Sequence, residues 1–178
     1  SIKMEKIRGE WANSNEVEAS YHDNEWGNEV HDDGQLFEFL VLESMQAGLS
    51  WSTILKKRET LSAAFDQFDY HKIATYTEEK VALLLQDPGI IRNKLKVQAT
   101  INNAKIFLAI QQEYGSFNEF IWSYVNHQPI KNSWTKLEEV PASTTLSDEI
   151  SKELKKKGFK FLGTTTVYAF MQATGMVN

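Results

Sequence analysis

Glu43 is a charged residue in line with apolar positions of a predicted helix. In a helix it would share one face with Leu36, Leu40 and Ala47, because these positions are three and four residues apart. A carboxylate on such a face, near the negative end of the helix dipole, is disfavoured both by burial and by the dipole. A residue placed where it costs stability is a candidate for function. The alternative is that Glu43 is half buried at the edge of the face and pairs with a lysine.

Large aromatic residues are concentrated in the first third of the chain, on both sides of Glu43: Trp11, Tyr21, Trp26 and Trp51. Flat aromatic faces around one buried carboxylate suit a pocket for a flat, cationic heterocycle. Stacking and cation–π attraction would hold the ring, and the carboxylate would accept hydrogen bonds from its polar edge. The alternative is that these side chains fill the core, which on residue type alone is the more common outcome.

A basic segment with two glycines lies near the C-terminus, at residues 155–165 (KKKGFKFLGTT). The flanking patterns predict two helices joined by a tight turn. Glycines allow the backbone to approach a phosphate, and amides at the N-terminus of the following helix can bind it. The lysines would add charge attraction. The alternative is a helix C-cap beside a solvated basic surface.

Cysteine chemistry is excluded, because the chain contains no cysteine for a disulfide, a thiolate metal site or a thiol nucleophile. The histidines have no metal-ligand spacing, and most are expected at the surface or at helix caps: His22, His31, His71 and His127. The sequence also has no phosphate-binding Walker loop, dinucleotide fingerprint or nucleophile elbow. We therefore expect neither a metal nor another cofactor.

The composition is that of an ordinary soluble protein. The 178 residues suffice for one domain, or one domain with a smaller lobe, and hydrophobic residues make up 42% of them. No apolar run reaches the roughly 18 residues that a membrane helix needs, and we see no secretion signal, so a cytoplasmic protein is expected. The net charge of −5 argues mildly against broad nucleic-acid binding, although a small basic face can lie on an acidic protein.

Helical periodicity covers most of the chain, so we predict an all-α fold. Residues 164–167 (TTTV) also fit a strand, but the following residues favour helix. Capping residues and glycine stops delimit the helices. The expected helices span about residues 33–47, 51–65, 77–85, 92–113, 116–124, 147–157 and 164–174, with caps at Asp32, Ser50, Thr77, Ser116 and Ser147.

Six stretches allow comparison with known families: residues 21–27 (YHDNEWG), 42–51 (LESMQAGLSW), 54–59 (ILKKRE), 89–92 (GIIR), 122–126 (WSYVN) and 158–165 (GFKFLGTT). In this order, over nearly the whole chain, they closely resemble the 3-methyladenine DNA glycosylase I family. The resemblance implies a helix-hairpin-helix glycosylase fold, with residues 1–178 as one domain that could comprise two helical lobes around the base pocket. It also implies an enzyme that flips 3-methyladenine out of duplex DNA and hydrolyses its N-glycosidic bond in base excision repair.

The resemblance assigns roles by position. Glu43 resembles the residue that hydrogen-bonds the methylated base, and Trp11, Tyr21 and Trp51 resemble its stacking partners, with Trp26 close by. The Gly48–Leu49 turn resembles a wedge that enters the duplex, and residues 158–165 resemble a hairpin that grips phosphates. The expected DNA-binding residues are Gly48, Leu49, Ser50, Gly158, Lys160, Gly163, Thr164 and Thr165.

Methylation at N3 makes adenine cationic in the nucleotide, and therefore a good leaving group. Excision then needs little acid catalysis and no covalent lysine. We expect a monomeric, monofunctional hydrolase, with Glu43 as its catalytic residue, that releases free 3-methyladenine without cleaving the strand. One rival is a non-catalytic helix-hairpin-helix module that binds DNA. The other is a small-molecule binding protein with an aromatic pocket, which the acidic net charge would favour.

The sequence departs from the family pattern in two places. The family holds a zinc ion with two cysteines and two histidines, but only the position of His22 matches here. Gly9 stands near the N-terminal cysteine position, and the chain stops at Asn178 before the C-terminal ligands. We therefore expect no zinc, with the termini tied by packing around Trp11. Glu18 stands where relatives often place a pocket tyrosine, so it either changes base preference or faces solvent.

Overall fold

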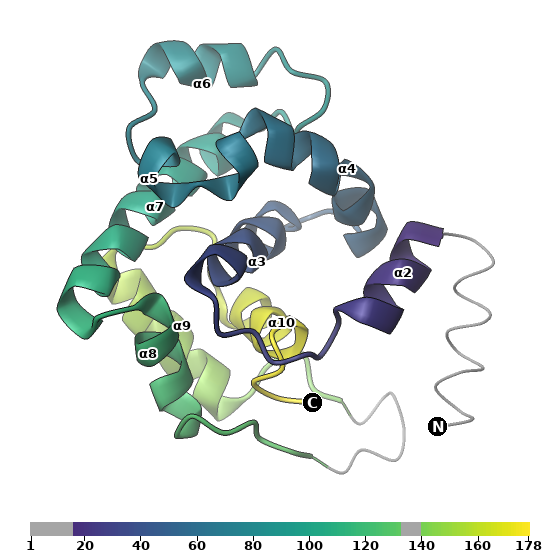
Figure 1. Cartoon of the computed structure of the whole chain (residues 1–178), viewed down its shortest axis with the longest axis vertical. Coiled ribbons are helices and arrows are strands. Elements are labelled where there is room, and N and C mark those ends of the chain that lie inside the picture. The colour runs from purple at the N-terminus through teal and green to yellow at the C-terminus, as the bar shows by residue number, and fades with distance from the viewer. Residues whose placement is uncertain (1–15, 133–139) are drawn as a thin grey trace.

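The computed structural model describes residues 16–132 and 140–178, and the regular structure of this part is helical (Figure 1). The predicted all-α fold is confirmed, and residues 164–167 are helical. The helices are α2 (Glu16–Asn24), α3 (Asp33–Met45), α4 (Trp51–Ala64), α5 (Tyr70–Ile73), α6 (Glu78–Leu84), α7 (Lys94–Tyr114), α8 (Phe117–Trp122), α9 (Thr145–Lys157) and α10 (Thr164–Ala173), with short 3-10 turns η1 (Asp66–Phe68) and η2 (Ser123–Val125).

Several helices begin where their caps predict. The side chains of Asp32, Ser50 and Thr77 accept hydrogen bonds from backbone N–H groups three residues later, at the start of α3, α4 and α6. Ser116 does the same for α8. Such caps satisfy amides that have no partner within the helix. These contacts are local, which is why the sequence reveals them.

Other boundaries differ from the prediction. Helix α7 begins at Lys94, because Asn93 caps it, and α9 begins before Ser147. Thr144 is the cap of α9, and Ser147 returns a hydrogen bond to it in a capping box. Helix α3 ends at Met45, two residues before the predicted end. The prediction missed α2 and α5, because one is polar without apolar periodicity and the other has a single turn.

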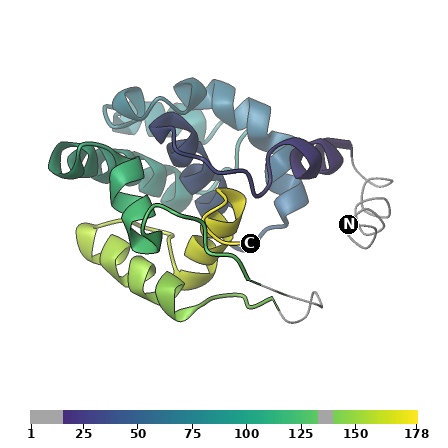
Figure 2. The same cartoon turned by 60° about the horizontal axis from the view of Figure 1, so that its bottom comes forward.

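Helix α3 lies at the centre of the molecule and contacts α4, α7, α8 and α10 (Figure 1). Its side chains from residue 36 to 45 are buried on all sides except at Glu38. Helices α9 and α10 pack against one another, and the view turned by 60° shows α9 running along the near face (Figure 2). A central helix with this environment is what places Glu43 in the interior.

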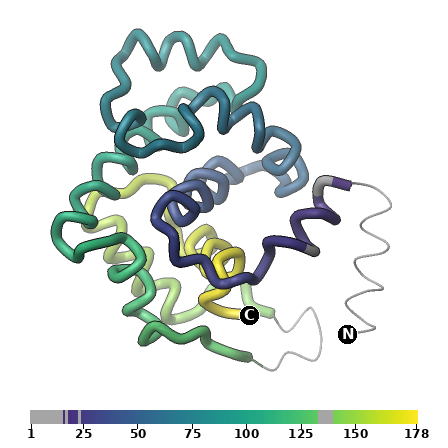
Figure 3. The backbone as a smooth tube through the Cα atoms, in the orientation of Figure 1, coloured from purple at the N-terminus to yellow at the C-terminus, as the bar shows by residue number. Residues whose placement is uncertain are grey.

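Helix α2 lies at the edge of the fold, where it packs on α4 (Figure 3). The backbone then runs from α2 into the central α3 and returns to the surface in α4. This path brings side chains of all three helices together. No helix in residues 16–132 or 140–178 has the length and hydropathy needed to cross a membrane.

Candidate active site

Glu43 is buried near the C-terminal end of α3, with 5% of its surface exposed. Burial raises the pKa of its carboxyl group to about 8. Among the described residues, no hydrogen bond or ion pair reaches its carboxylate. The alternative of a half-buried glutamate paired with a lysine is therefore wrong. A buried carboxyl group without a partner is expensive, so Glu43 is the strongest candidate for a group that meets a ligand.

Glu43 lies at a cleft of about 260 Å³ between the C-terminal end of α3 and the first turns of α10. The turn that follows α3 forms its third wall. The cleft therefore brings together three features that are far apart in the sequence: the buried carboxylate, the Gly48–Leu49 turn and the end of the hairpin segment. Its lining residues are Glu43, Gln46, Ala47, Gly48, Leu49, Thr165, Thr166 and Ala169.

Tyr21 and Trp51 form an aromatic pair near Glu43. Their ring centroids are 5.5 Å apart in an edge-to-face arrangement, and Tyr21 is buried while Trp51 is half-buried. Burial raises the pKa of Tyr21, and the negative charge of Glu43 raises it further, which places the two side chains within electrostatic range. The hydroxyl of Tyr21 is buried without a hydrogen-bond partner among the described residues. It is thus a second polar group that a ligand could satisfy.

The structure does not place the other predicted pocket residues at Glu43. Trp26 is 40% exposed and stacks on His22, with ring centroids 6.1 Å apart, so the geometry does not support it as part of the pocket. Trp11 lies outside the described residues. Glu18 is 4% exposed, so the alternative in which it faces solvent is wrong, and an effect on base preference stays a prediction. Tyr21 contacts Trp51 and lies within electrostatic range of Glu43, but neither ring lines the cleft at Glu43.

The turn after α3 is an exposed element with an apolar tip. Gly48 has φ = +80°, a left-handed conformation that favours glycine, and 38% of the surface of Leu49 is exposed. This exposure suits the wedge expected from the sequence. The Ser50 hydroxyl is already used, because it accepts a hydrogen bond of 3.1 Å from the backbone N–H of Thr53 and so caps α4.

The predicted hairpin is the connection between α9 and α10. Gly158 ends α9 with φ = +107°, and Gly163 precedes the first turn of α10. No side chain of the described residues caps α10, so the amides of its first turn are available to an anion. Thr164 bonds the hydroxyl of Ser147 at 2.7 Å, whereas Lys160 and Thr165 are exposed. The described geometry is compatible with phosphate binding.

The three consecutive lysines do not form a uniform basic surface. Lys155 and Lys156 are exposed, but the ammonium of Lys157 lies over the rings of Tyr114 and Phe120, 5.2 Å and 5.5 Å from the ring centroids. Its ammonium also lies 3.7 Å from a carboxylate oxygen of Glu113. Lys157 is therefore committed to contacts within the protein.

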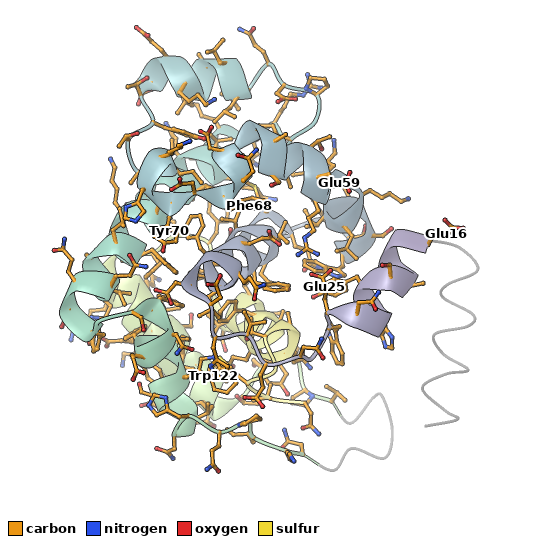
Figure 4. All side chains as sticks on the ribbon, in the orientation of Figure 1. Glu16, Glu25, Glu59, Phe68, Tyr70 and Trp122 are labelled. Atoms are coloured by element: carbon orange, nitrogen blue, oxygen red, sulfur yellow. The ribbon has the colours of Figure 1, made fainter. Side chains whose placement is uncertain are left out.

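The sequence analysis missed an ion-pair cluster behind the aromatic pair. Arg58 on α4 donates two hydrogen bonds to Glu25, of 2.7 and 2.9 Å, and its Nε donates a third to Glu38, of 3.0 Å. Glu25 directly follows α2, and its label lies between α2 and α4 in Figure 4. The cluster thus ties α2, which carries Tyr21, to α3 and α4. The only signal of this cluster in the sequence is that Glu25 and Arg58 lie in two of the stretches that resemble the glycosylase family, residues 21–27 and 54–59.

The residues present do not fit the zinc site that the resemblance implies. The chain has no cysteine, and the described residues contain no group of three or more His, Cys, Asp or Glu side chains arranged to hold a metal. We predict that purified protein contains well under one zinc ion per chain by elemental analysis, and that a chelator leaves its Tm unchanged. A stoichiometric zinc ion, or a lower Tm in chelator, would contradict this prediction.

Comparison with known proteins gives a consistent result. A model of the methyladenine glycosylase family matches residues 11–178. DNA-3-methyladenine glycosylase 1 of Escherichia coli (strain K12) is 52% identical over 94% of this chain and 90% of its own length. DNA-3-methyladenine glycosylase of Haemophilus influenzae is 47% identical over 94% of this chain and 91% of its own. The structure of 3-methyladenine DNA glycosylase I from Staphylococcus aureus, solved to explain 3-methyladenine recognition, superposes with a TM-score of 0.89 at 41% identity, covering 91% of this chain and 86% of that one.

Proposed function

The chain belongs to the methyladenine glycosylase family, and we propose that it excises 3-methyladenine from DNA by holding the extruded base against Glu43. Its activity is that of a DNA-3-methyladenine glycosylase, a hydrolase that cleaves N-glycosyl bonds in DNA repair. The observation that carries the proposed site is the buried carboxyl group of Glu43, which has no hydrogen-bond or ion-pair partner among the described residues and lies at a cleft of about 260 Å³.

Selection of the damaged base follows from charge. A nucleotide of 3-methyladenine is cationic, whereas one of ordinary adenine is neutral. The ionised form of Glu43 attracts the cation strongly in a buried site, and Tyr21 and Trp51 offer aromatic surface for stacking. Ordinary adenine would leave the carboxyl group without its counter-charge. The binding energy therefore discriminates by charge as well as by shape.

Hydrolysis needs little beyond this selection. The cationic base is already a good leaving group, so water can attack an oxocarbenium-like sugar while Glu43 holds the departing base. No lysine lines the described cleft, and the ammonium of the nearby Lys96 is bonded to two backbone carbonyls. These observations support a monofunctional enzyme that forms no Schiff base and does not cleave the strand.

The DNA contacts are proposed from exposure and backbone geometry. The exposed Gly48–Leu49 turn at the rim of the cleft suits a wedge that fills the gap left by the base. The uncapped first turn of α10, with Lys160 beside it, suits phosphate binding. We propose that the substrate is double-stranded DNA, that the chain acts as a monomer in the cytoplasm, and that residues 1–178 form one domain. Packing of α3 against helices from both halves of the chain supports a single domain.

The decisive test is release of bases from methylated duplex DNA, with the freed bases identified by chromatography. We expect free 3-methyladenine in the supernatant and none from unmethylated duplex. The DNA strand should remain intact until hot alkali cleaves it at the abasic site. A folded protein that binds the duplex but releases no base would overturn the proposal and favour the non-catalytic DNA-binding module.

A further inference from the structure

One face of α7 carries the buried polar side chains of Lys96, Thr100 and Asn103, and those of Lys96 and Asn103, with 6% and 4% of their surfaces exposed, reach outside the helix, whereas Thr100 bonds the Lys96 carbonyl within it. Lys96 and Asn103 are seven residues apart, which is two helical turns, so they point the same way. Neither belongs to the cleft or to the ion-pair cluster. Each reaches the backbone of a different exposed turn.

Lys96 reaches the turn that follows α3. Its Nζ donates hydrogen bonds to the carbonyl oxygens of Met45, at 2.7 Å, and Ala47, at 2.6 Å. These carbonyls lie at the negative end of the α3 dipole, where a cation is favourable. The next two residues are Gly48 and Leu49, and the N–H of Leu49 donates a hydrogen bond of 2.6 Å to the carbonyl of Gln46 in the same turn. Among the described residues, nothing lies within 4 Å of the point where a Cβ of Gly48 would be.

Asn103 reaches the connection between α9 and α10. Its Nδ2 donates to the carbonyl of Lys160, at 3.0 Å, and its Oδ1 accepts from the N–H of the same residue, at 2.9 Å. The neighbouring Asn102 donates to the carbonyl of Gly158, at 2.7 Å. Two adjacent side chains of α7 thus hold the hairpin backbone on both sides of Phe159.

We propose that Lys96 and Asn103 are positioning residues that hold the wedge turn and the phosphate-binding hairpin at a fixed separation on α7. This inference rests on the proposed function, because it takes both turns as DNA contacts. A base can enter the cleft only if the wedge and the hairpin engage one duplex at the same time. A rigid helix bonded to both turns sets their spacing before DNA binds. The conformational entropy of the two turns is therefore already lost in the free protein and does not weaken DNA binding.

The two residues act at different stages of the reaction. Lys96 sets the turn that enters the duplex, so its loss should slow extrusion and lower kcat. Asn103 sets the backbone that meets phosphates, so its loss should weaken duplex binding. Neither loss should change the affinity for free 3-methyladenine, because neither side chain lines the cleft.

The test uses the full chain, and wild-type base release is measured first, because its absence would refute the proposed function rather than this inference. For Lys96→Met we expect kcat to fall by about tenfold to a hundredfold, with the Kd of undamaged duplex unchanged. For Asn103→Leu we expect the Kd of duplex to rise by about tenfold. Both variants should bind free 3-methyladenine within about twofold of wild type, a limit smaller than one typical net hydrogen bond.

The matched controls are Lys72→Met, which removes an exposed charge from α5, and Gln112→Leu, which removes an exposed amide from α7. Both should retain wild-type kcat and Kd. If Lys96→Met does not fold, Lys96→Gln, which keeps one donor group, is measured in its place. Unchanged kcat and Kd in folded variants would overturn the inference. The inference would also be overturned if the affinity for free 3-methyladenine fell by the same factor as kcat or duplex affinity, because that outcome indicates general loosening of the fold.

Discussion

Replacing Glu43 with glutamine is expected to lower kcat/KM for release of 3-methyladenine from duplex DNA by about a hundredfold. Glutamine has the shape of the glutamate and still accepts a hydrogen bond, but it carries no charge opposite the cationic base. Base release measured at substrate concentrations well below KM gives the ratio directly. Glu79→Gln on α6, which alters an exposed carboxylate, should release bases at the wild-type rate.

The same substitution should stabilise the fold, and this effect should depend on pH. The folded protein holds a proton on Glu43 up to a pKa of about 8, whereas the unfolded chain releases it near the ordinary value of 4.5. Between these values the folded state binds more protons, so the stability of the wild type falls as pH rises. Glutamine has no such dependence. At pH 8 the free energy of unfolding of the variant should exceed that of the wild type by a few kcal/mol, and near pH 4.5 this difference should vanish.

Urea unfolding of both proteins at a series of pH values measures this difference. The pH profile of excision is a second readout, since kcat/KM reports ionisation in the free enzyme. Wild-type kcat/KM should rise with pH, reach half of its plateau at the Glu43 pKa of about 8 and level off above it, while the profile of the variant should lack this step. If the variant excised bases at the wild-type rate and gained no stability, the assignment of Glu43 to the proposed site would be wrong.

Replacing Arg58 with methionine is the second large change, and it should destabilise the protein by about 2–4 kcal/mol. The substitution leaves Glu25 and Glu38, which share the guanidinium, facing one another without a cation. It also releases α2 from α4, so the affinity for free 3-methyladenine should fall because Tyr21 is carried by α2. Chemical unfolding and fluorescence titration with the free base measure the two effects.

The control for this experiment is Lys56→Met, which removes an exposed positive charge from the same helix. It should change stability by less than about 0.5 kcal/mol. Adding Glu25→Gln and Glu38→Gln to the Arg58 variant should restore part of the lost stability, because the unpaired charges are then removed. If Arg58→Met lowered stability no more than the control does, the ion-pair cluster would have no role in holding α2.

The sequence alone was sufficient for features that depend on neighbouring residues. The caps Asp32, Ser50 and Thr77 bond amides within their own first turn, so a short window contains both partners. The apolar spacing around Glu43 likewise identified a helix with a carboxylate on its apolar face. The family likeness added the activity, because long motifs in order are specific to one family.

Only the tertiary structure decided which of those residues meet. Glu43 is buried because four helices surround α3, and Tyr21 reaches Trp51 because α2 folds back on α4. Trp26, on the same short segment as Tyr21, turns instead to His22 at the surface. Residue type cannot separate these two aromatic side chains, because burial depends on which helix faces are covered by distant parts of the chain.

The anchoring contacts were beyond sequence reasoning for the same reason. Lys96 bonds carbonyls 49 and 51 residues away, and Asn103 bonds a backbone 57 residues away. A lysine or an asparagine in a helix is ordinarily predicted to face solvent, and no neighbouring residue in the sequence indicates that these two are buried. The sequence determined most of the helices, several of their caps and the chemistry available to the chain. Long-range packing decided which side chains are buried and which backbone segments they bond. The reason is that burial and hydrogen bonding across the fold depend on all helices at once.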